Sequence, residues 1–184
     1  MALTKTPICD FGKKAENFKL NSTDNKIISL DDVKGKNGTL IMFICNHCPY
    51  VKAVIEDIVQ DCKKLEEFGI KAAAICSNDV KNYPEDSFEN MIKFSQNHNF
   101  NFPYLFDETQ EIAKNYGAVC TPDFFGYNKD LELQYRGRIK ELKDLKPVSS
   151  GDSDLYKSMK QIAETTNGPK NQIPSMGCNI KWKK

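Results

Sequence analysis

The spacing of hydrophobic and polar residues predicts a strand, a helix and a second strand in the first half of the chain. Residues 39–44 are apolar on both faces, which is typical of a parallel strand covered by helices. In residues 49–68 the apolar positions recur at steps of three and four, as in an amphipathic helix. Residues 70–76 then predict a second buried strand.

Weaker patterns predict further elements on both sides of this unit. In chain order they are an N-terminal hairpin over residues 11–20 and 27–30, a helix opening at Pro84, a strand at 103–106, a helix at 109–116, an antiparallel pair at 124–127 and 133–139, and a last helix after 149–152. Asp107 is expected to cap the helix at 109–116. The pattern as a whole predicts an α/β fold with a central mixed sheet flanked by helices.

The C-terminal segment, residues 167–184, is too apolar to be free coil. After several turn-forming residues it contains Ile173, Cys178, Ile180 and Trp182. A chain of 184 residues suits one domain. We therefore expect a single domain spanning residues 1–184, with the tail docked on it.

Charge and hydropathy exclude several classes of partner. The net charge is +1, so the chain has no field that would attract nucleic acid or acidic lipid. The longest apolar run, residues 40–45, is far too short to span a bilayer, and residues 1–10 lack the apolar core of a signal peptide. A cytoplasmic protein without nucleic-acid or membrane partners is expected.

Candidate chemistry is concentrated at Cys45 and Cys48, where the first buried strand meets the helix. The total of seven cysteines is odd, which argues against a secreted disulfide framework and favours reduced thiols, some of them functional. The N–H groups at a helix N-terminus favour a negatively charged sulfur. Cys48 directly precedes Pro49, so its sulfur lies at the helix start, and we expect it to be the nucleophile.

Ionisation of Cys48 would need further help from its neighbours. A thiol with a pKa of about 8.5 is only about 3% thiolate at pH 7, and a helix terminus contributes roughly 0.5 to 2 kcal/mol to lowering the pKa. His47 is the nearest candidate, since its imidazolium could stabilise the adjacent thiolate. The hypothesis also requires the sulfur of Cys48 to be accessible, because a deeply enclosed thiol argues against a redox role.

Several motifs resemble the thioredoxin-like redoxins, the group that includes the alkyl hydroperoxide reductase and thiol-specific antioxidant family. They are Gly12-x-x-Ala15-x-x-Phe18-x-Leu20, Gly35-Lys36, Asn46-His47-Cys48-Pro49-Tyr50-Val51, Tyr116-Gly117-Ala118-Val119 before Pro122, and Gly177-Cys178-Asn179-Ile180-Lys181-Trp182. The third and the last together resemble the peroxiredoxin-like branch. The resemblance covers nearly the whole chain and implies the thioredoxin fold.

The chain departs from the family at the thiol motif itself. Counted from Phe43, the attacking position of thioredoxin-like reductases falls on Cys48, and Val51 stands where the second cysteine should be. Peroxiredoxins carry a threonine three residues before their reactive cysteine, and Cys45 takes that place here. The resolving thiol is therefore open among Cys45, Cys120 and Cys178.

The resemblance also implies a substrate groove. In this fold the proline before the hairpin is usually cis and faces the reactive cysteine, which here is Pro122. Thr121 would give backbone hydrogen bonds to an extended partner. With Pro49 and Tyr50 these are the candidate substrate-binding residues, beside the catalytic candidates Cys48, Cys45, His47 and Cys120.

These features favour an antioxidant-type enzyme, a thiol-disulfide oxidoreductase acting on a disulfide- or thiol-containing protein or small molecule. A thioredoxin- or glutathione-type electron donor would serve it, and no cofactor or metal is expected. One alternative is a thiol peroxidase, although the only arginines, Arg136 and Arg138, lie on the predicted hairpin. Others are a metal-binding module like the copper carriers, which have a cysteine where Lys52 stands, and a scaffold without chemistry.

Other residues have weaker functional signals. Asp79 and Asp123 follow predicted strands and are candidate proton carriers, although loop carboxylates are mostly solvated. Cys62 and Cys76 occupy apolar positions and are expected to be buried, and Cys9 lies near the chain end. The sequence predicts neither the substrate nor the oligomeric state.

Overall fold

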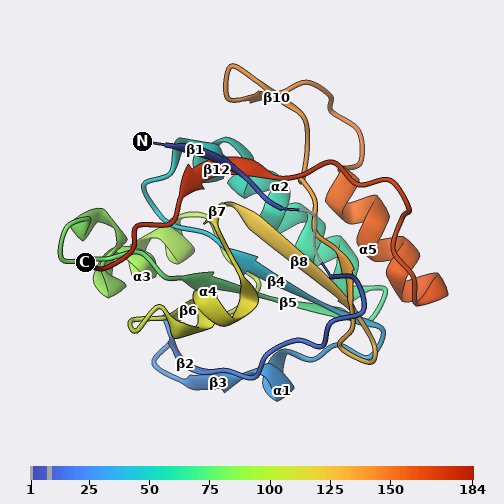
Figure 1. The fold of residues 1–184 in the computed structure, drawn as a ribbon, viewed down its shortest axis with the longest axis horizontal. Coiled ribbons are helices and arrows are strands. Elements are labelled where there is room, and N and C mark those ends of the chain that lie inside the picture. The colour runs from blue at the N-terminus through green and yellow to red at the C-terminus, as the bar shows by residue number, and fades with distance from the viewer. Residues whose placement is uncertain (1, 8–9) are drawn as a thin grey trace.

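The computed structural model describes residues 2–7 and 10–184, and its centre is a seven-stranded mixed sheet (Figure 1). The strand order is β3-β2-β6-β5-β4-β8-β9. In that order the strands are Ile27–Ser29, Lys19–Ser22, Tyr104–Phe106, Ile70–Cys76, Gly38–Phe43, Asp123–Asn128 and Leu133–Tyr135. Strands β4, β5 and β6 are parallel, and the others pair antiparallel with their neighbours. The predicted mixed sheet and N-terminal hairpin are confirmed.

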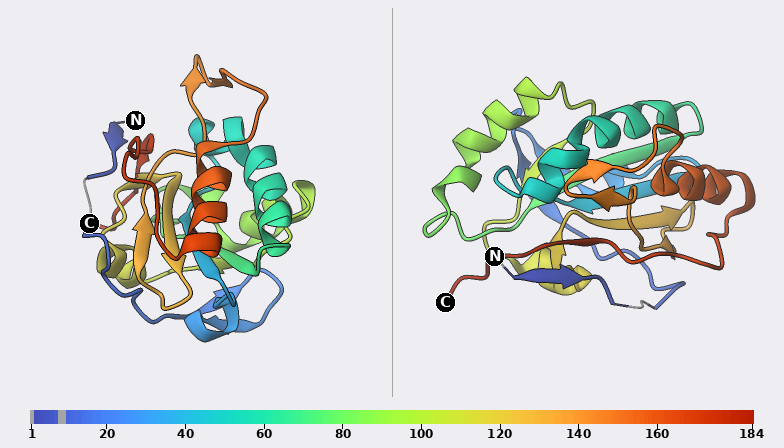
Figure 2. Two further views of the ribbon diagram at one scale, coloured as in Figure 1. Left: turned by 90° about the vertical axis from the view of Figure 1, so that its right-hand side faces the viewer. Right: turned by 90° about the horizontal axis from the view of Figure 1, so that it is seen from above.

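Helices cover both faces of this sheet (Figure 2). They are α1 (Leu30–Val33), α2 (Pro49–Glu66), the 3-10 helix η1 (Pro84–Asp86), α3 (Phe88–Asn97), α4 (Glu111–Tyr116) and α5 (Asp154–Thr165). The apolar stripes of α2, α3 and α5 pack on one face, and α1 and α4 pack on the other. No helix in the described ranges combines the length and the apolar character that a membrane crossing requires.

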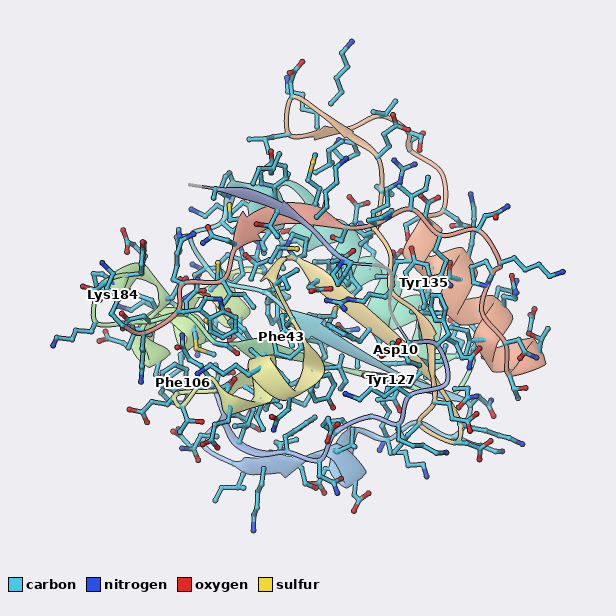
Figure 3. All side chains as sticks on the ribbon, viewed as in Figure 1. Asp10, Phe43, Phe106, Tyr127, Tyr135 and Lys184 are labelled. Carbon is cyan, nitrogen blue, oxygen red and sulfur yellow. The ribbon has the colours of Figure 1, made fainter. Side chains whose placement is uncertain are left out.

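Strand β4 holds the two layers together because both of its faces are buried. Leu40 and Met42 belong to the cluster under α2, while Ile41 and Phe43 belong to the cluster under α4. Figure 3 shows Phe43 near the middle of the molecule. This burial is what the uninterrupted apolar run predicted, and it fixes the point at which the chain leaves the sheet and enters α2.

A second, smaller sheet joins the two chain ends. It has the order β1-β12-β7, formed by Leu3–Lys5, Met176–Asn179 and Cys120–Thr121. In Figure 1 the red β12 runs beside the dark blue β1, above the beginning of α2. A two-stranded hairpin, β10 (Leu142–Lys143) and β11 (Lys146–Pro147), protrudes from the body. The C-terminal tail is thus part of a sheet next to the candidate thiols.

Two helix starts differ from the sequence prediction. The helix predicted to open at Pro84 is divided in two. The first part is the short 3-10 helix η1, and α3 begins only after Ser87, whose side chain accepts a hydrogen bond from the Asn90 N–H. The N-cap of α4 is Gln110, in a left-handed conformation with φ of 65°. Asp107 still serves that helix, because its carboxylate accepts a hydrogen bond from the Ala113 N–H at 2.9 Å.

Candidate active site

Cys48 is the N-cap residue of α2, as the sequence predicted. Its backbone is extended, with φ of −66° and ψ of 122°, and Pro49 begins the helix behind it. The chain reaches this point directly from β4, and the Ile44 N–H still bonds to the Ile75 carbonyl of the neighbouring strand. The sulfur is therefore held at the carboxyl edge of the parallel strands, where α/β proteins commonly place their sites.

Three thiols meet around Thr121. The Cys45 sulfur lies 3.4 Å from the Thr121 hydroxyl oxygen, and the Cys48 sulfur lies 3.2 Å from the Thr121 carbonyl oxygen. The sulfur of Cys178, on β12, lies only 3.1 Å from that of Cys48. All six described cysteines are free thiols. Cys45 and Cys178, two of the candidate resolving residues, thus both contact this site.

Cys48 is the acidic member of this group. The hydrogen bond from Cys45 is the largest influence and lowers its pKa, burial acts against it, and Cys178, Thr121 and the Val51 N–H lower it further, to about 5. The helix start contributes only the last of these influences, through the Val51 N–H. The neighbouring thiol therefore outweighs the helix N-terminus, which the sequence had suggested as the main influence.

The other two thiols hold their protons more tightly. The hydrogen bond to Cys48 and burial raise the pKa of Cys45 well above its ordinary value. Burial, followed by the interaction with Cys48, raises the pKa of Cys178 to about 12. At neutral pH the site therefore consists of one thiolate with S–H donors around it.

His47 is oriented by a carboxylate that the sequence analysis missed. Its Nδ1 lies 2.6 Å from the Asp86 carboxylate and 3.9 Å from the Cys45 sulfur. The Asp86 hydrogen bond is the largest influence that raises the pKa of His47, and the negative sulfur of Cys48 adds to it. The ring also stacks on Tyr83, with centroids 5.6 Å apart. His47 interacts with Cys48 through charge, while its hydrogen bond goes to Asp86.

Asp86 also holds the loop that carries His47. Its side chain is fully buried and accepts hydrogen bonds from the backbone N–H groups of Asn46, at 2.8 Å, and His47, at 3.2 Å. Burial acts to raise the pKa of Asp86, but the bonds from His47 and Asn78 leave it lowered. An ionised carboxylate therefore fixes the backbone just before Cys48.

The Thr121–Pro122 peptide bond is cis, as the resemblance implied. Thr121 turns its side chain toward Cys45, so Cys120, its neighbour on β7, points to the other side of the strand. The Cys120 sulfur contacts the Pro122 carbonyl oxygen at 3.6 Å, and burial raises the pKa of this thiol strongly. Of the three candidate resolving thiols, Cys120 is therefore the least suitably oriented.

A groove of about 290 Å³ opens between the first turn of α2 and the cis proline, and its lining residues do not include the three thiols. Two of the predicted substrate-binding residues, Tyr50 and Pro122, line it, together with Val54, Ile139 and Ile173. Pro49 and Thr121 lie next to these two in the chain. Its mixed polar and apolar walls could receive a segment of a substrate.

The sequence prediction was wrong about access to Cys48. The sulfur-bearing side chains of Cys48 and Cys178 are 0% and 3% exposed, because β12 lies directly over the start of α2. Periodicity could not reveal this cover, since the tail is far away in the sequence. The enclosure implies that β12 has to move before a substrate sulfur can reach Cys48.

Asp79 and Asp123, the candidate proton carriers, are engaged in structural contacts. The Asp79 carboxylate accepts hydrogen bonds within its own turn, from Asn82 and from the Lys81 N–H. Asp123 is fully buried and pairs with Arg136 at 2.9 Å. Neither arrangement resembles a proton carrier at the thiol site.

The remaining cysteines are remote from the reactive thiols. Cys62, in the C-terminal half of α2, and Cys76, at the end of β5, are buried in the core. Burial raises the pKa of both, that of Cys76 to about 12. Cys9 lies outside the described residues.

Within the described part of the chain, one cluster has metal-ligating side chains. The candidate ligand atoms of Cys45, His47 and Asp86 lie within 4.8 Å of one another. However, the Nδ1 of His47 is only 2.6 Å from the Asp86 oxygen, closer than the roughly 3 Å separation of two ligands that each lie about 2.0–2.1 Å from a zinc ion. As arranged, the pair is a hydrogen bond that orients His47.

Comparisons with known proteins agree with the fold and with the thiol chemistry. The chain is 28% identical, over 69% of its own length and 69% of the relative's, to the thiol-disulfide oxidoreductase ResA of Bacillus thuringiensis. It is 40% identical to an uncharacterized conserved protein from Geobacillus kaustophilus, whose crystal structure superposes with a TM-score of 0.94 over 100% of this chain and 97% of that one.

A more distant structure confirms the fold. The thioredoxin domain of a thiol-disulfide oxidoreductase from Bacteroides vulgatus is 14% identical and superposes with a TM-score of 0.59, over 70% of this chain and 89% of that one. The sequence profile of the AhpC/TSA family matches residues 11–141, well over half of the chain. The fold is therefore the thioredoxin fold, and the chain belongs to the AhpC/TSA family of thioredoxin-like redoxins.

Proposed function

We propose that this protein is a thiol-disulfide oxidoreductase whose nucleophile is the Cys48 thiolate. One observation carries the proposal. Of the six described cysteines, only Cys48 has a lowered pKa, at about 5, while its neighbours Cys45 and Cys178 have raised values. Disulfide exchange requires a sulfur that is ionised at neutral pH and a second thiol beside it that can attack the mixed disulfide. The site provides both.

The reaction follows from these ionisation states. The Cys48 thiolate attacks one sulfur of a substrate disulfide and forms a mixed disulfide, while the other substrate sulfur leaves as a thiolate and takes a proton from water. A second protein thiol then loses its proton and attacks the Cys48 sulfur. A protein disulfide forms, and the remaining substrate sulfur leaves. Two electrons have passed from the protein to the substrate. A thioredoxin- or glutathione-type donor then reduces the protein disulfide with two further electrons.

The substrate class in this proposal is a disulfide- or thiol-containing protein or small molecule. The groove lined by Tyr50 and Pro122 supports it, because a segment bound there lies beside the Cys48 loop. His47 takes a positioning role. Its bond to Asp86 favours the positively charged form of the ring near the thiolate, and Nδ1 is engaged with Asp86.

The direct test is reduction of a protein disulfide, such as that of insulin, with dithiothreitol as the donor. We expect activity above the dithiothreitol background for the native chain and none for Cys48→Ser. The matched control is Cys62→Ser, which changes a cysteine of the same helix that lies far from the site. If Cys48→Ser retains the native rate while folded, the assignment is wrong.

A cytoplasmic location is part of the proposal. Free thiols throughout the described chain suit a reducing compartment. Fractionation of the source cells should recover the protein with the soluble cytoplasmic markers. Recovery with periplasmic or membrane fractions would contradict this location.

Thiol peroxidase activity is the second candidate, and it has less support. The family includes peroxide-reducing members, but Arg136 is committed to the buried pair with Asp123 and Arg138 bonds to Asp154 at 2.8 Å. Neither of the chain's two arginines is therefore free to stabilise a peroxide beside Cys48. Hydrogen peroxide consumption should be slow relative to disulfide reduction, and a peroxide rate exceeding the disulfide rate would reverse this order.

A further inference from the structure

The C-terminal strand β12 occupies the backbone edge beside the reactive thiol. Cys178 pairs with Thr121 and Asn179 pairs with Cys120, so β12 is hydrogen-bonded in antiparallel register to the strand that leads into the cis proline. An added antiparallel strand at an open edge is a common way to bind an extended peptide. Here a segment of the same chain fills that position and carries a cysteine to the nucleophile.

We propose that Cys178 is the resolving thiol of Cys48, and that β12 must leave the edge of β7 to admit a disulfide-bearing extended segment and return to it to complete the exchange. This inference rests on the proposed function. It selects one resolving residue from the alternatives that the sequence leaves open, and it assigns the tail a part in each turnover.

The sulfur geometry favours Cys178. Its sulfur lies 3.1 Å from that of Cys48, and a disulfide bond is about 2.05 Å long, so a shift of about 1 Å joins them. Cys45 also interacts with the Cys48 sulfur, but its own sulfur contacts the Thr121 hydroxyl and Nδ1 of His47. Cys45 is therefore placed to donate a hydrogen bond to the Cys48 thiolate rather than to attack the mixed disulfide.

The order of the two steps follows from charge. While Cys48 is a thiolate, its charge helps to keep Cys178 protonated. In the mixed disulfide that charge is gone, so Cys178 loses its proton more easily, and Lys181 favours its thiolate. The Cys178 thiolate then attacks the Cys48 sulfur, the Cys48–Cys178 bond forms, and the substrate sulfur leaves and is protonated. A dithiol reductant then reduces the Cys48–Cys178 disulfide to two thiols and is itself oxidised to a disulfide.

The tail is built to approach β7 closely and to detach locally. A Cβ on Gly177 would lie 2.0 Å from the Thr121 carbonyl oxygen, so only glycine allows the observed contact. The pairing of β12 with β7 covers two residue pairs, flanked by the bond from the Ile180 N–H to the Val119 carbonyl, and β12 can keep its three pairs with β1 when it leaves β7. Beyond it the chain is anchored, since Lys181 bonds through its backbone to Asn78 and Asp79. The short paired stretch can therefore open while its anchor holds.

The experiment is a single turnover with a small aromatic disulfide, 5,5′-dithiobis(2-nitrobenzoate), followed by peptide mass mapping. The native chain should release two aromatic thiols from this site, retain no adduct on Cys48 and end with a Cys48–Cys178 disulfide. Cys178→Ser should release one and keep a stable aromatic adduct on Cys48. If Cys178→Ser does not fold, Cys178→Ala replaces it.

Cys45→Ser is the matched comparison, because it removes the other neighbouring thiol. We expect it to react more slowly but still to form the Cys48–Cys178 disulfide without a lasting adduct. Tryptic cleavage places Cys48 in residues 37–52 and Cys178 in residues 171–181, so this disulfide joins two peptides, and in Cys45→Ser its assignment is unambiguous. A lasting adduct in Cys45→Ser but not in Cys178→Ser would overturn the inference. Absence of both an adduct and a disulfide at Cys48 in all variants would instead overturn the proposed function.

A second variant tests the strand itself. Gly177→Ala should displace β12 and increase the rate at which iodoacetamide alkylates Cys48 by about tenfold or more, because the reaction requires the open form. Circular dichroism checks that the fold is intact. An unchanged alkylation rate in folded Gly177→Ala would show that β12 does not control access to Cys48.

Discussion

The N-cap of α2 and its C-terminal half contain the same residue type in opposite chemical states. Cys48 begins the helix among donors and has a pKa of about 5, whereas Cys62 lies on the buried stripe of the same helix, where burial raises its pKa well above the ordinary value. Both side chains are almost completely enclosed. Burial alone therefore does not decide the acidity of a thiol. The acidity of a buried thiol depends on whether hydrogen-bond donors contact its sulfur.

The largest stability effect is expected at Cys62, in the C-terminal half of the helix. Cys62→Ser places a hydroxyl in an apolar cluster and should lower the free energy of unfolding by about 1–3 kcal/mol. Denaturant unfolding measures it. Disulfide reduction per folded molecule should stay at the native rate, since Cys62 takes no part in the site. A loss of activity without a loss of stability would contradict the division between the two regions.

The next effect concerns the donor next to Cys48. Cys45→Ala removes the largest influence on the Cys48 thiolate, and the Cys48 pKa should rise by about 1–2 units. The fraction of thiolate near pH 5 should fall about tenfold as a result. Titration of the thiolate ultraviolet absorbance gives the value. A Cys48 pKa that stays near 5 in Cys45→Ala would contradict the main role assigned to Cys45.

The smallest effect on the Cys48 pKa is expected from Asp86, which contacts His47 rather than Cys48 itself. Asp86→Asn removes the carboxylate that raises the pKa of His47, so this pKa should fall. NMR titration of the ring measures it. The Cys48 pKa should then rise by less than it does in Cys45→Ala, with disulfide reduction slowed only a few-fold. An unshifted His47 pKa would contradict the role assigned to Asp86.

The features that the sequence predicted correctly are local ones. The apolar run at β4, the spacing of α2 and the position of Cys48 before Pro49 are each determined within a few residues, so periodicity and capping rules predict them. Asp107 shows the limit of such rules. Its carboxylate accepts a hydrogen bond from the Ala113 N–H of α4, as a capping residue would, but the N-cap position itself is taken by the left-handed Gln110.

The missed features depend on contacts between distant segments. Asp86, which was not a candidate, reaches His47 across 39 residues. Cys178 was one of three candidate resolving thiols, and its contact with Cys48 spans 130 residues. No spacing rule connects such positions, because tertiary packing alone brings them together. The motif Gly177-Cys178 was visible as a resemblance, but its contact with Thr121, and the cover that it places over Cys48, depend on the pairing of β12 with β7.

The most direct test of the central claim is the difference in thiolate ultraviolet absorbance between the native protein and Cys48→Ser as a function of pH. It reads ionisation while β12 remains docked and needs no reagent to reach the sulfur. Because the charged form lies on the alkaline side of the pKa, the absorbance should appear as the pH rises, with a midpoint near 5. A midpoint near the ordinary thiol value of about 8.5 would contradict the assignment of Cys48 as the ionised nucleophile.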